Sequence, residues 1–381
     1  MARKTTEEIK EICKKFNTDR LWSFSRFNCF RTSPYEYYLK YIEHAETDRA
    51  NCVYGCMGGM AHDILEKFYT GDIKYADIIN EFEDSWLTTQ IAGLKFDRNN
   101  EESNEKIGIK YYDNLKHFFL NYKPLPYKMT NEQFITIKVG KYHFQGYIDA
   151  VFKDEDEIVN ILDYKTSTIY TGAKIEKESA QLLLYALGLN QMGVPWDKLK
   201  ICWNFLKYAT VDVKQAKGDF NTRNIARNEI GFKLKSSAKM WLKKDGYSEE
   251  EIEEYLQLLT EMNNIECLPK SVHDKFIVRD CYVYVDITPE MIERLKTEII
   301  STLDHIVDLE KEFKISKDDK LFWDSDASVE KESYYFATLC DFSAYLHKPY
   351  GAYLDRLKAK RDESKGLNNM QDEDLDWLKD L

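Results

Sequence analysis

Two neighbouring apolar segments that carry charged residues constrain the fold of this 381-residue chain more than any other feature. The segment GYIDAVF contains Asp149, and the segment EIVNILDYK ends in Asp163 and Lys165. An acidic turn at 154–157 separates them, so they are predicted to form adjacent strands of one sheet. Because alternate residues of a strand face the same side, Asp163 and Lys165 are expected to share a face, with Asp149 close by on the next strand.

Charges at the end of such an apolar strand are costly unless they are paired or bound to a metal ion. Mg²⁺ is commonly held by one or two carboxylates together with water, so Asp149 and Asp163 suit Mg²⁺ or Mn²⁺. Such an ion lowers the pKa of a bound water and neutralises charge on a phosphate. An ammonium at Lys165 can position the attacking water and stabilise the phosphate in the transition state. The alternative is an exposed ion pair of Asp163 and Lys165 without a catalytic role.

The hydrophobic pattern along the whole chain predicts an α/β or α+β fold with a mixed sheet. The core is expected to contain three meandering strands, then a helix at about 176–192 and a strand over 199–213. The predicted units, in chain order, are a mainly helical region (1–130), the core (131–216), a helical insertion (217–270), a strand and helices that complete the core (271–350) and an acidic, mobile tail (351–381).

Four short motifs occur in one order along the chain. They are Gly58-x-x-x-His62, Gly146-x-x-Asp149, Asp163-Tyr164-Lys165 and Gln181-x-x-x-Tyr185. With these motifs the sequence resembles the PD-(D/E)XK nuclease superfamily, in particular the RecB-like exonuclease branch that includes AddB nuclease domains and CRISPR adaptation nucleases. The resemblance implies a restriction-endonuclease-like mixed sheet flanked by helices.

The resemblance also implies roles for the motif residues. Lys165 would be the catalytic lysine, and Gln181 and Tyr185, one helical turn apart, would flank the site and help to hold the substrate or the lysine. The implied metal ligands are His62, Asp149, Asp163 and the carbonyl oxygen of Tyr164. Two alternatives stay open: His62 can be a helix-face histidine satisfied by a neighbour, and Tyr185 can be a core residue.

Some members of this branch bind an iron–sulfur cluster through a cysteine before a proline near the N-terminus and three cysteines near the C-terminus. Here Ser33-Pro34 stands at the first position, and only Cys340 remains of the three. A cluster needs four thiolates, so no iron–sulfur cluster is expected, and packing is expected to replace it.

The net charge of −12 argues against adhesion of the whole surface to nucleic acid, but a local basic groove remains compatible with it. Eight basic and two acidic residues lie between Lys217 and Lys244, whereas 245–266 contains eight acidic residues and no Lys or Arg. The alternative to DNA contact is a solvated face that pairs with this acidic helix. The predicted phosphate contacts are Arg223, Arg227, Lys233, Lys235, Lys239 and Lys243.

No stretch approaches the roughly 18 consecutive apolar residues of a membrane span, and the N-terminus lacks the apolar core of a signal peptide. A cytoplasmic protein of a bacterium or a phage-infected host, without membrane partners, is therefore expected. The tail segment QDEDLDWLKDL is a candidate docking peptide for a replication or recombination protein, or else a disordered solubilising end.

Three functions are compatible with these features. The leading hypothesis is a metal-dependent DNA exonuclease in replication, recombination or repair. The sequence contains no Gly-x-x-x-x-Gly-Lys-Ser/Thr loop, so no helicase motif accompanies the nuclease motifs. The second is a structure-selective or CRISPR-adaptation-type endonuclease. The third is a non-catalytic DNA-binding or assembly protein with the same fold, against which the intact Asp149, Asp163 and Lys165 argue.

Overall fold

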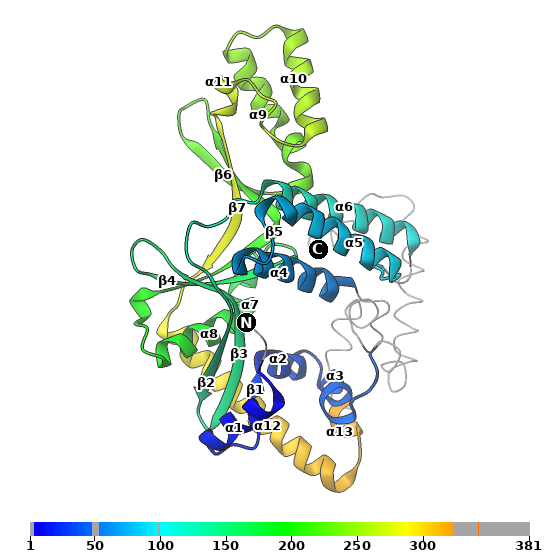
Figure 1. The fold of residues 1–381 in the computed structure, drawn as a ribbon, viewed down its shortest axis with the longest axis vertical. Helices are drawn as coiled ribbons and strands as arrows, with labels where there is room; N and C mark the ends of the chain where they lie inside the picture. The colour runs from blue at the N-terminus through cyan, green and yellow to red at the C-terminus, as the bar shows by residue number, and fades with distance from the viewer. Residues whose placement is uncertain (1–3, 48–52, 98–99, 324–341, 343–381) are drawn as a thin grey trace.

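A seven-stranded mixed sheet forms the centre of the protein (Figure 1). The computed structural model describes residues 4–47, 53–97, 100–323 and Phe342. The main path of the sheet runs β1–β3–β4–β5–β6, while β2 pairs with β3 and β7 pairs with β5. Together with the helices that flank it, this sheet confirms the predicted fold class. The strands are β1 (Trp22–Ser23), β2 (Thr130–Val139), β3 (Tyr142–Lys153), β4 (Val159–Lys165), β5 (Leu199–Lys214), β6 (Phe220–Ala226) and β7 (Phe276–Val285).

Helices pack against the sheet in two separate apolar clusters. In one cluster, the helices α2, α3, α8 and α12 cover residues of β2, β3, β4 and β5. In the other, α4, α5 and α6 cover the even-numbered residues at the ends of β3 and β4. No described helix combines the length and the apolar character that crossing a bilayer requires. The helices outside the 217–270 insertion are α1 (Thr6–Phe16), α2 (Phe24–Thr32), α3 (Pro34–Tyr38), α4 (Val53–Thr70), α5 (Ile78–Ile91), α6 (Glu101–Asn121), α7 (Ala173–Glu178), α8 (Ala180–Gln191), α12 (Pro289–Ser316) and α13 (Lys320–Trp323), with short π or 3₁₀ turns at Leu39–Glu43, Tyr75–Asp77 and Trp196–Lys198.

The order β2–β3–β4–α8–β5 agrees with the order predicted from the sequence. Gly140, with a φ of 58°, forms the tight turn between β2 and β3. The crossover through α7 and α8 then brings β5 parallel to β4. Helix α8 is buried on nearly every side because it packs against β2, β4, β5 and α12. A Cβ atom at Gly188 would lie 2.7 Å from Cγ1 of Ile137, so glycine is what allows α8 to approach β2 this closely.

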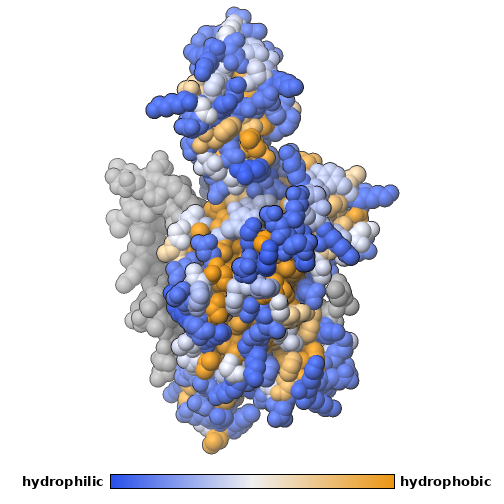
Figure 2. Space-filling view, turned by 90° about the vertical axis from the view of Figure 1, so that its left-hand side faces the viewer, coloured by the Kyte–Doolittle hydropathy of each residue, from blue (hydrophilic) through white to orange (hydrophobic). Residues whose placement is uncertain are grey.

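The 217–270 insertion differs in one respect from its prediction as wholly helical. Residues 220–226 form β6, an edge strand that pairs with β5, and the 3₁₀ turn Arg227–Glu229 follows. Beyond it, α9 (Ile230–Lys244), α10 (Glu249–Met262) and α11 (Lys270–His273) enclose a third apolar cluster with β5. Ser248 and Glu251 form a capping box at the start of α10. This insertion projects from one end of the molecule, and its surface is mostly hydrophilic on the face shown in Figure 2.

Gly231→Ala should destabilise the insertion by about 1–3 kcal/mol, the usual cost of overpacking. A Cβ atom at this position would lie 2.0 Å from the carbonyl oxygen of Leu259, so α9 and α10 would have to separate. Amide hydrogen exchange in the two helices measures the effect. The matched control is Gly59→Ala on α4, where an added Cβ meets nothing within 4 Å; it should leave stability unchanged or raise it by up to about 1 kcal/mol. Equal protection of α9 and α10 in Gly231→Ala and the wild type would contradict this prediction.

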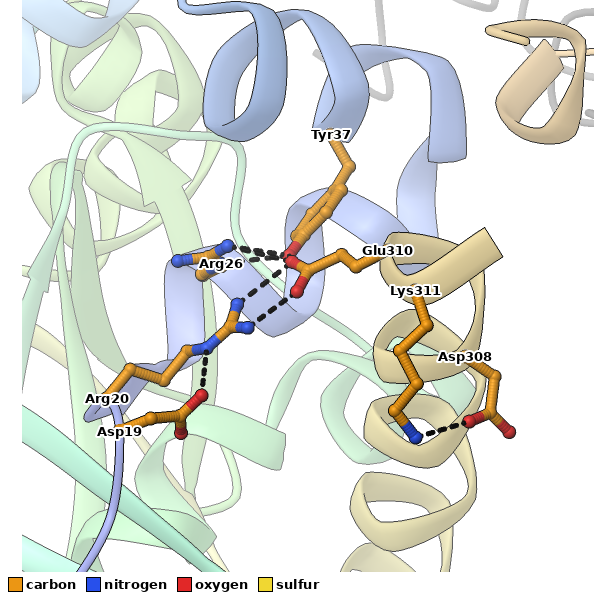
Figure 3. Close-up of polar contacts among 7 residues, drawn as sticks. All are labelled: Asp19, Arg20, Arg26, Tyr37, Asp308, Glu310 and Lys311. Carbon is orange, nitrogen blue, oxygen red and sulfur yellow. Dashed lines mark hydrogen bonds and ion pairs between the residues drawn. The ribbon is translucent and has the colours of Figure 1, made fainter. Parts of the chain in front are cut away.

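A cluster of buried ionic contacts joins the N-terminal segment to α12 (Figure 3). The carboxylate of Glu310 accepts hydrogen bonds from Arg20 at 2.9 and 2.6 Å and from Arg26 at 3.1 Å. The hydroxyl of Tyr37 donates to the same carboxylate at 2.7 Å. The rings of Trp22 and Tyr37 lie against the guanidinium groups. We call Arg20, Trp22, Arg26, Tyr37 and Glu310 the Glu310 clasp.

The predicted tail at 351–381, Cys340 and most of 324–350 lie outside the described residues.

Candidate active site

The pairing of β3 with β4 brings Asp149 and Asp163 together. Ala150 pairs with Leu162 in the antiparallel register, and one further step places Asp149 opposite Asp163. Side chains opposite each other on neighbouring antiparallel strands have Cβ atoms about 5 Å apart. The backbone N–H of Tyr164 donates a hydrogen bond to Asp149 Oδ2 at 3.1 Å, which fixes this carboxylate against the end of β4. The two carboxylates therefore face one site, as the sequence predicts.

Lys165 lies beside the second carboxylate. Its Nζ atom is 2.7 Å from Asp163 Oδ2, and the Asp163 side chain is only 6% exposed. Burial acts to lower the pKa of Lys165, but the Asp163 carboxylate outweighs burial and raises it above the usual lysine value. The ammonium therefore stays protonated, as the predicted catalytic role requires.

His62 reaches the same site from α4, which packs on the opposite face of the sheet from α8. Its Nε2 atom donates to the carbonyl oxygen of Tyr164 at 2.7 Å, since a carbonyl can only accept. Its Nδ1 atom lies 3.4 Å from Asp149 Oδ2. The hydrogen-bonding needs of His62 are thus met by its neighbours, as the alternative of a helix-face histidine predicts. These neighbours, Asp149 and the Tyr164 carbonyl, are themselves predicted metal ligands.

The electrostatics of the site favour a cation. Burial raises the pKa of Asp149 to about 7, and repulsion by the Asp163 carboxylate adds to this shift. Asp163 Oδ2 is buried and, within the described part of the chain, accepts no hydrogen bond of good geometry besides its ion pair with Lys165. Two carboxylates in a buried site with one ammonium leave an excess of negative charge, which a divalent ion would neutralise.

The donor atoms fit a hard divalent ion, but only with help from the backbone and water. Among the described residues, no group of three or more His, Cys, Asp or Glu side chains is assembled around a metal position. Mg²⁺ normally takes only one or two carboxylates and completes its octahedron with other oxygens and water. Adjacent ligand atoms of such an octahedron lie about 3 Å apart. The 2.7 Å between His62 Nε2 and the Tyr164 carbonyl oxygen is close to this spacing.

Gln181 and Tyr185 flank the site from α8. Gln181 Nε2 donates to the hydroxyl of Tyr185 at 3.1 Å. The Tyr185 ring packs on β3 at Gly146, where an added Cβ would lie 2.6 Å from ring atom Cε1. The glycine of the Gly-x-x-Asp motif thus provides room for the tyrosine. Burial raises the pKa of Tyr185, and the charges of Asp163, Asp149 and Lys165 also act on it, so its hydroxyl remains protonated beside the site.

The structure brings two further residues to the edge of the site that were not selected from the sequence. The hydroxyl of buried Tyr111 donates to the carbonyl of Thr166, the residue that follows Lys165, at 2.9 Å. Lys207 lies on β5, two positions beyond Phe205, which pairs with Lys165. In the sequence, Tyr111 is one of many aromatic residues at helical spacing, and Lys207 is one lysine within a strand. No motif or spacing in the neighbouring sequence marks either residue as part of the site.

The predicted phosphate contacts separate into two groups. Arg227 is a correction: it is 2% exposed, it pairs with Asp280 of β7, and its guanidinium covers the ring of Phe118, so it cannot reach DNA. Lys243 pairs with Glu249 of α10 at 2.7 Å, as the alternative of pairing with the acidic helix predicts, and Lys233 pairs with the nearby Glu229 at 3.6 Å. By contrast, Arg223, Lys235 and Lys239 form no ion pair within the residues that the structure describes.

Comparison with known proteins agrees with this geometry. No curated protein matches the chain. The sequence profile of the PD-(D/E)XK nuclease superfamily matches residues 21–279, more than half of the chain and a range that includes all four motifs. The chain therefore belongs to the PD-(D/E)XK nuclease superfamily, and its mixed sheet is the restriction-endonuclease-like fold of that superfamily.

Proposed function

We propose that this protein is a metal-dependent DNA nuclease whose active site consists of Asp149, Asp163 and Lys165. The observation that carries the proposal is the convergence of two carboxylates from β3 and β4, one buried and one partly buried, beside one protonated lysine. Membership of the superfamily supports a nuclease function independently of this geometry.

Each residue has a role that follows from its position. Asp149, Asp163 and the Tyr164 carbonyl, with His62 beside them, would hold Mg²⁺ or Mn²⁺. When bound, the ion supplies an activated water and neutralises charge on the phosphate. The ammonium of Lys165, fixed by Asp163, orients the attacking water and stabilises the added negative charge of the phosphate. Gln181 and Tyr185 flank this face and would help to hold the substrate or the lysine.

We further propose an exonuclease that acts from DNA ends in replication, recombination or repair, on the basis of the resemblance to the RecB-like branch. An endonuclease of the structure-selective or CRISPR-adaptation type is the competing proposal. A non-catalytic DNA-binding protein is disfavoured, because a site without a reaction has no need of three charged side chains that are largely withdrawn from solvent.

Incubation of the protein with linear and closed circular DNA, in Mg²⁺ or Mn²⁺, tests the function. Degradation of linear DNA alone supports an exonuclease, whereas cutting of closed circles supports an endonuclease. Chelation by EDTA should stop either reaction. Retained DNA binding without cleavage of either substrate in either metal would overturn the nuclease proposal.

Charge reversal at Lys235 and Lys239 tests their contact with DNA. Both lysines lie on α9 without an ion pair in the described part of the chain, so each can neutralise a phosphate. The double substitution to Glu should weaken DNA binding and reduce the slope of affinity against salt. Charge reversal at Lys243, already paired with Glu249, is the comparison and should have a smaller effect. Unchanged affinity in the double variant would exclude this patch.

A further inference from the structure

A cavity of about 640 Å³ lies between the body of the protein and the insertion. Its walls come from four parts of the chain that are distant in sequence: α4, α6, β5 and the segment from β6 to α9. The residues that the argument uses are Tyr54, Lys110, Tyr111, Lys207, Arg223 and Lys233.

This cavity adjoins the active site. Tyr111 lines it and donates its hydroxyl hydrogen bond to the carbonyl of Thr166, directly after the catalytic lysine. Lys207 lines it from β5, just beyond the point where β4 ends beside Phe205. Tyr111 and β5 thus link the cavity to the end of β4 that carries Lys165.

The cavity is positively charged in a protein whose net charge is −12. Lys110, Lys207, Arg223 and Lys233 line it, and among the described residues Glu229 is the only lining carboxylate, so four cations stand against one anion there. Glu229 lies 3.6 Å from Lys233 and compensates that residue alone. A local excess of this kind concentrates anionic ligands.

Two of the cations are partly buried without a counter-charge. Lys207 forms no ion pair or side-chain hydrogen bond with any described residue, and its Nζ atom lies over the ring of Tyr111, 4.1 Å from the centroid. Burial lowers the pKa of Lys207 to about 8, with no carboxylate to oppose this shift. Arg223 donates from Nη2 to the carbonyl of Lys233 at 3.1 Å, while its Nε atom is buried and has no described hydrogen-bond partner. Such groups are costly to bury alone, and an anionic ligand would remove that cost.

We propose that this cavity is a phosphate-binding subsite for the nucleic acid strand that occupies the active site, with Lys207 and Arg223 as its principal cations. The proposal rests on the proposed nuclease function for the identity of the ligand. Guanidinium and ammonium groups together suit phosphate oxygens. The ring of Tyr54 on the same wall offers a face on which a sugar or base can pack.

The test is the binding of a fluorescein-labelled single-stranded oligodeoxynucleotide, measured by anisotropy in EDTA so that no cleavage occurs. Lys207→Met keeps the length and packing of the side chain but removes its charge. We expect about tenfold weaker binding at 0.1 M salt and a slope of log affinity against log salt that is smaller by about 0.7. Lys207→Arg should restore most of the affinity. The matched control is Lys153→Met, since Lys153 is exposed and paired with Glu157 at the far end of β3.

Unchanged affinity and salt slope in Lys207→Met, with normal circular dichroism, would overturn the subsite. Arg223→Gln provides the same test through a second residue and should also weaken binding. The two proposals fail separately. If the wild type cuts no DNA and Lys207→Met binds the oligonucleotide more weakly than the wild type does, only the nuclease function is contradicted. If the wild type cuts DNA and both Lys207→Met and Arg223→Gln bind the oligonucleotide as tightly as the wild type does, only the subsite is contradicted.

Discussion

Asp163→Asn should reduce metal-dependent DNA hydrolysis on the order of 10³-fold or more, which is the size of effect expected when a group that stabilises transition-state charge is lost. Asparagine has the shape of aspartate but no charge, so the site loses a metal ligand and Lys165 loses its counter-ion at 2.7 Å. The rate of release of labelled nucleotides or fragments from linear DNA measures the effect.

Lys165→Met distinguishes the two roles within this site. It should lower the catalytic rate by a similar factor but leave Mn²⁺ binding intact, because an ammonium cannot be a metal ligand. Asp163→Asn should weaken Mn²⁺ binding, measured by calorimetry without DNA. The matched control is Asp308→Asn, since Asp308 is 75% exposed and, among the described residues, pairs only with Lys311 on the surface of α12 (Figure 3). Equal hydrolysis by Asp163→Asn and Asp308→Asn would remove Asp163 from the active site.

Strand β4 could be predicted from the sequence because its signal is local. The two-residue period of a strand fixes that Asp163 and Lys165 share a face, whatever the strand packs against. The position of Asp149 opposite Asp163 needed the antiparallel register, which the short acidic turn between the strands restricts strongly. His62 was available only through its motif, because its contact with Tyr164 joins two segments far apart in the chain.

Two predictions from the sequence are wrong: the DNA contact of Arg227 and the wholly helical insertion, which contains strand β6. Arg227 was assigned to DNA because the count of charges around it is basic, but its partner Asp280 comes from β7, beyond the insertion. A local charge count contains no information on such a partner. Strand β6 was missed because most of its residues are exposed and polar, as an edge strand allows, so neither alternation nor an apolar run marks it.

Glu310→Gln should lower the free energy of unfolding by about 2–4 kcal/mol at neutral pH, since it leaves two guanidinium groups without their counter-charge. The Glu310 side chain is 10% exposed, and Arg20 and Arg26 are 26% and 20% exposed, so solvent screens the loss only in part. The clasp holds residues 20–37 against α12. Urea unfolding measures the change.

The matched control is Glu298→Gln on the same helix. Glu298 is 42% exposed and pairs only with Arg31 in the part of the chain that the structure describes, so its loss should cost at most about 1 kcal/mol.

The clasp also has a defined pH dependence. Burial would raise the pKa of Glu310, but hydrogen bonds from Arg20 and Tyr37 outweigh burial and hold it below its usual range. Its contribution to stability is thus complete above the ordinary glutamate pKa of about 4.3 and is lost as pH falls through the lowered folded value. The difference in free energy of unfolding between the wild type and Glu310→Gln should accordingly shrink in acid. A difference that stays constant down to the pH of acid unfolding would show that the clasp does not act through the charge of Glu310.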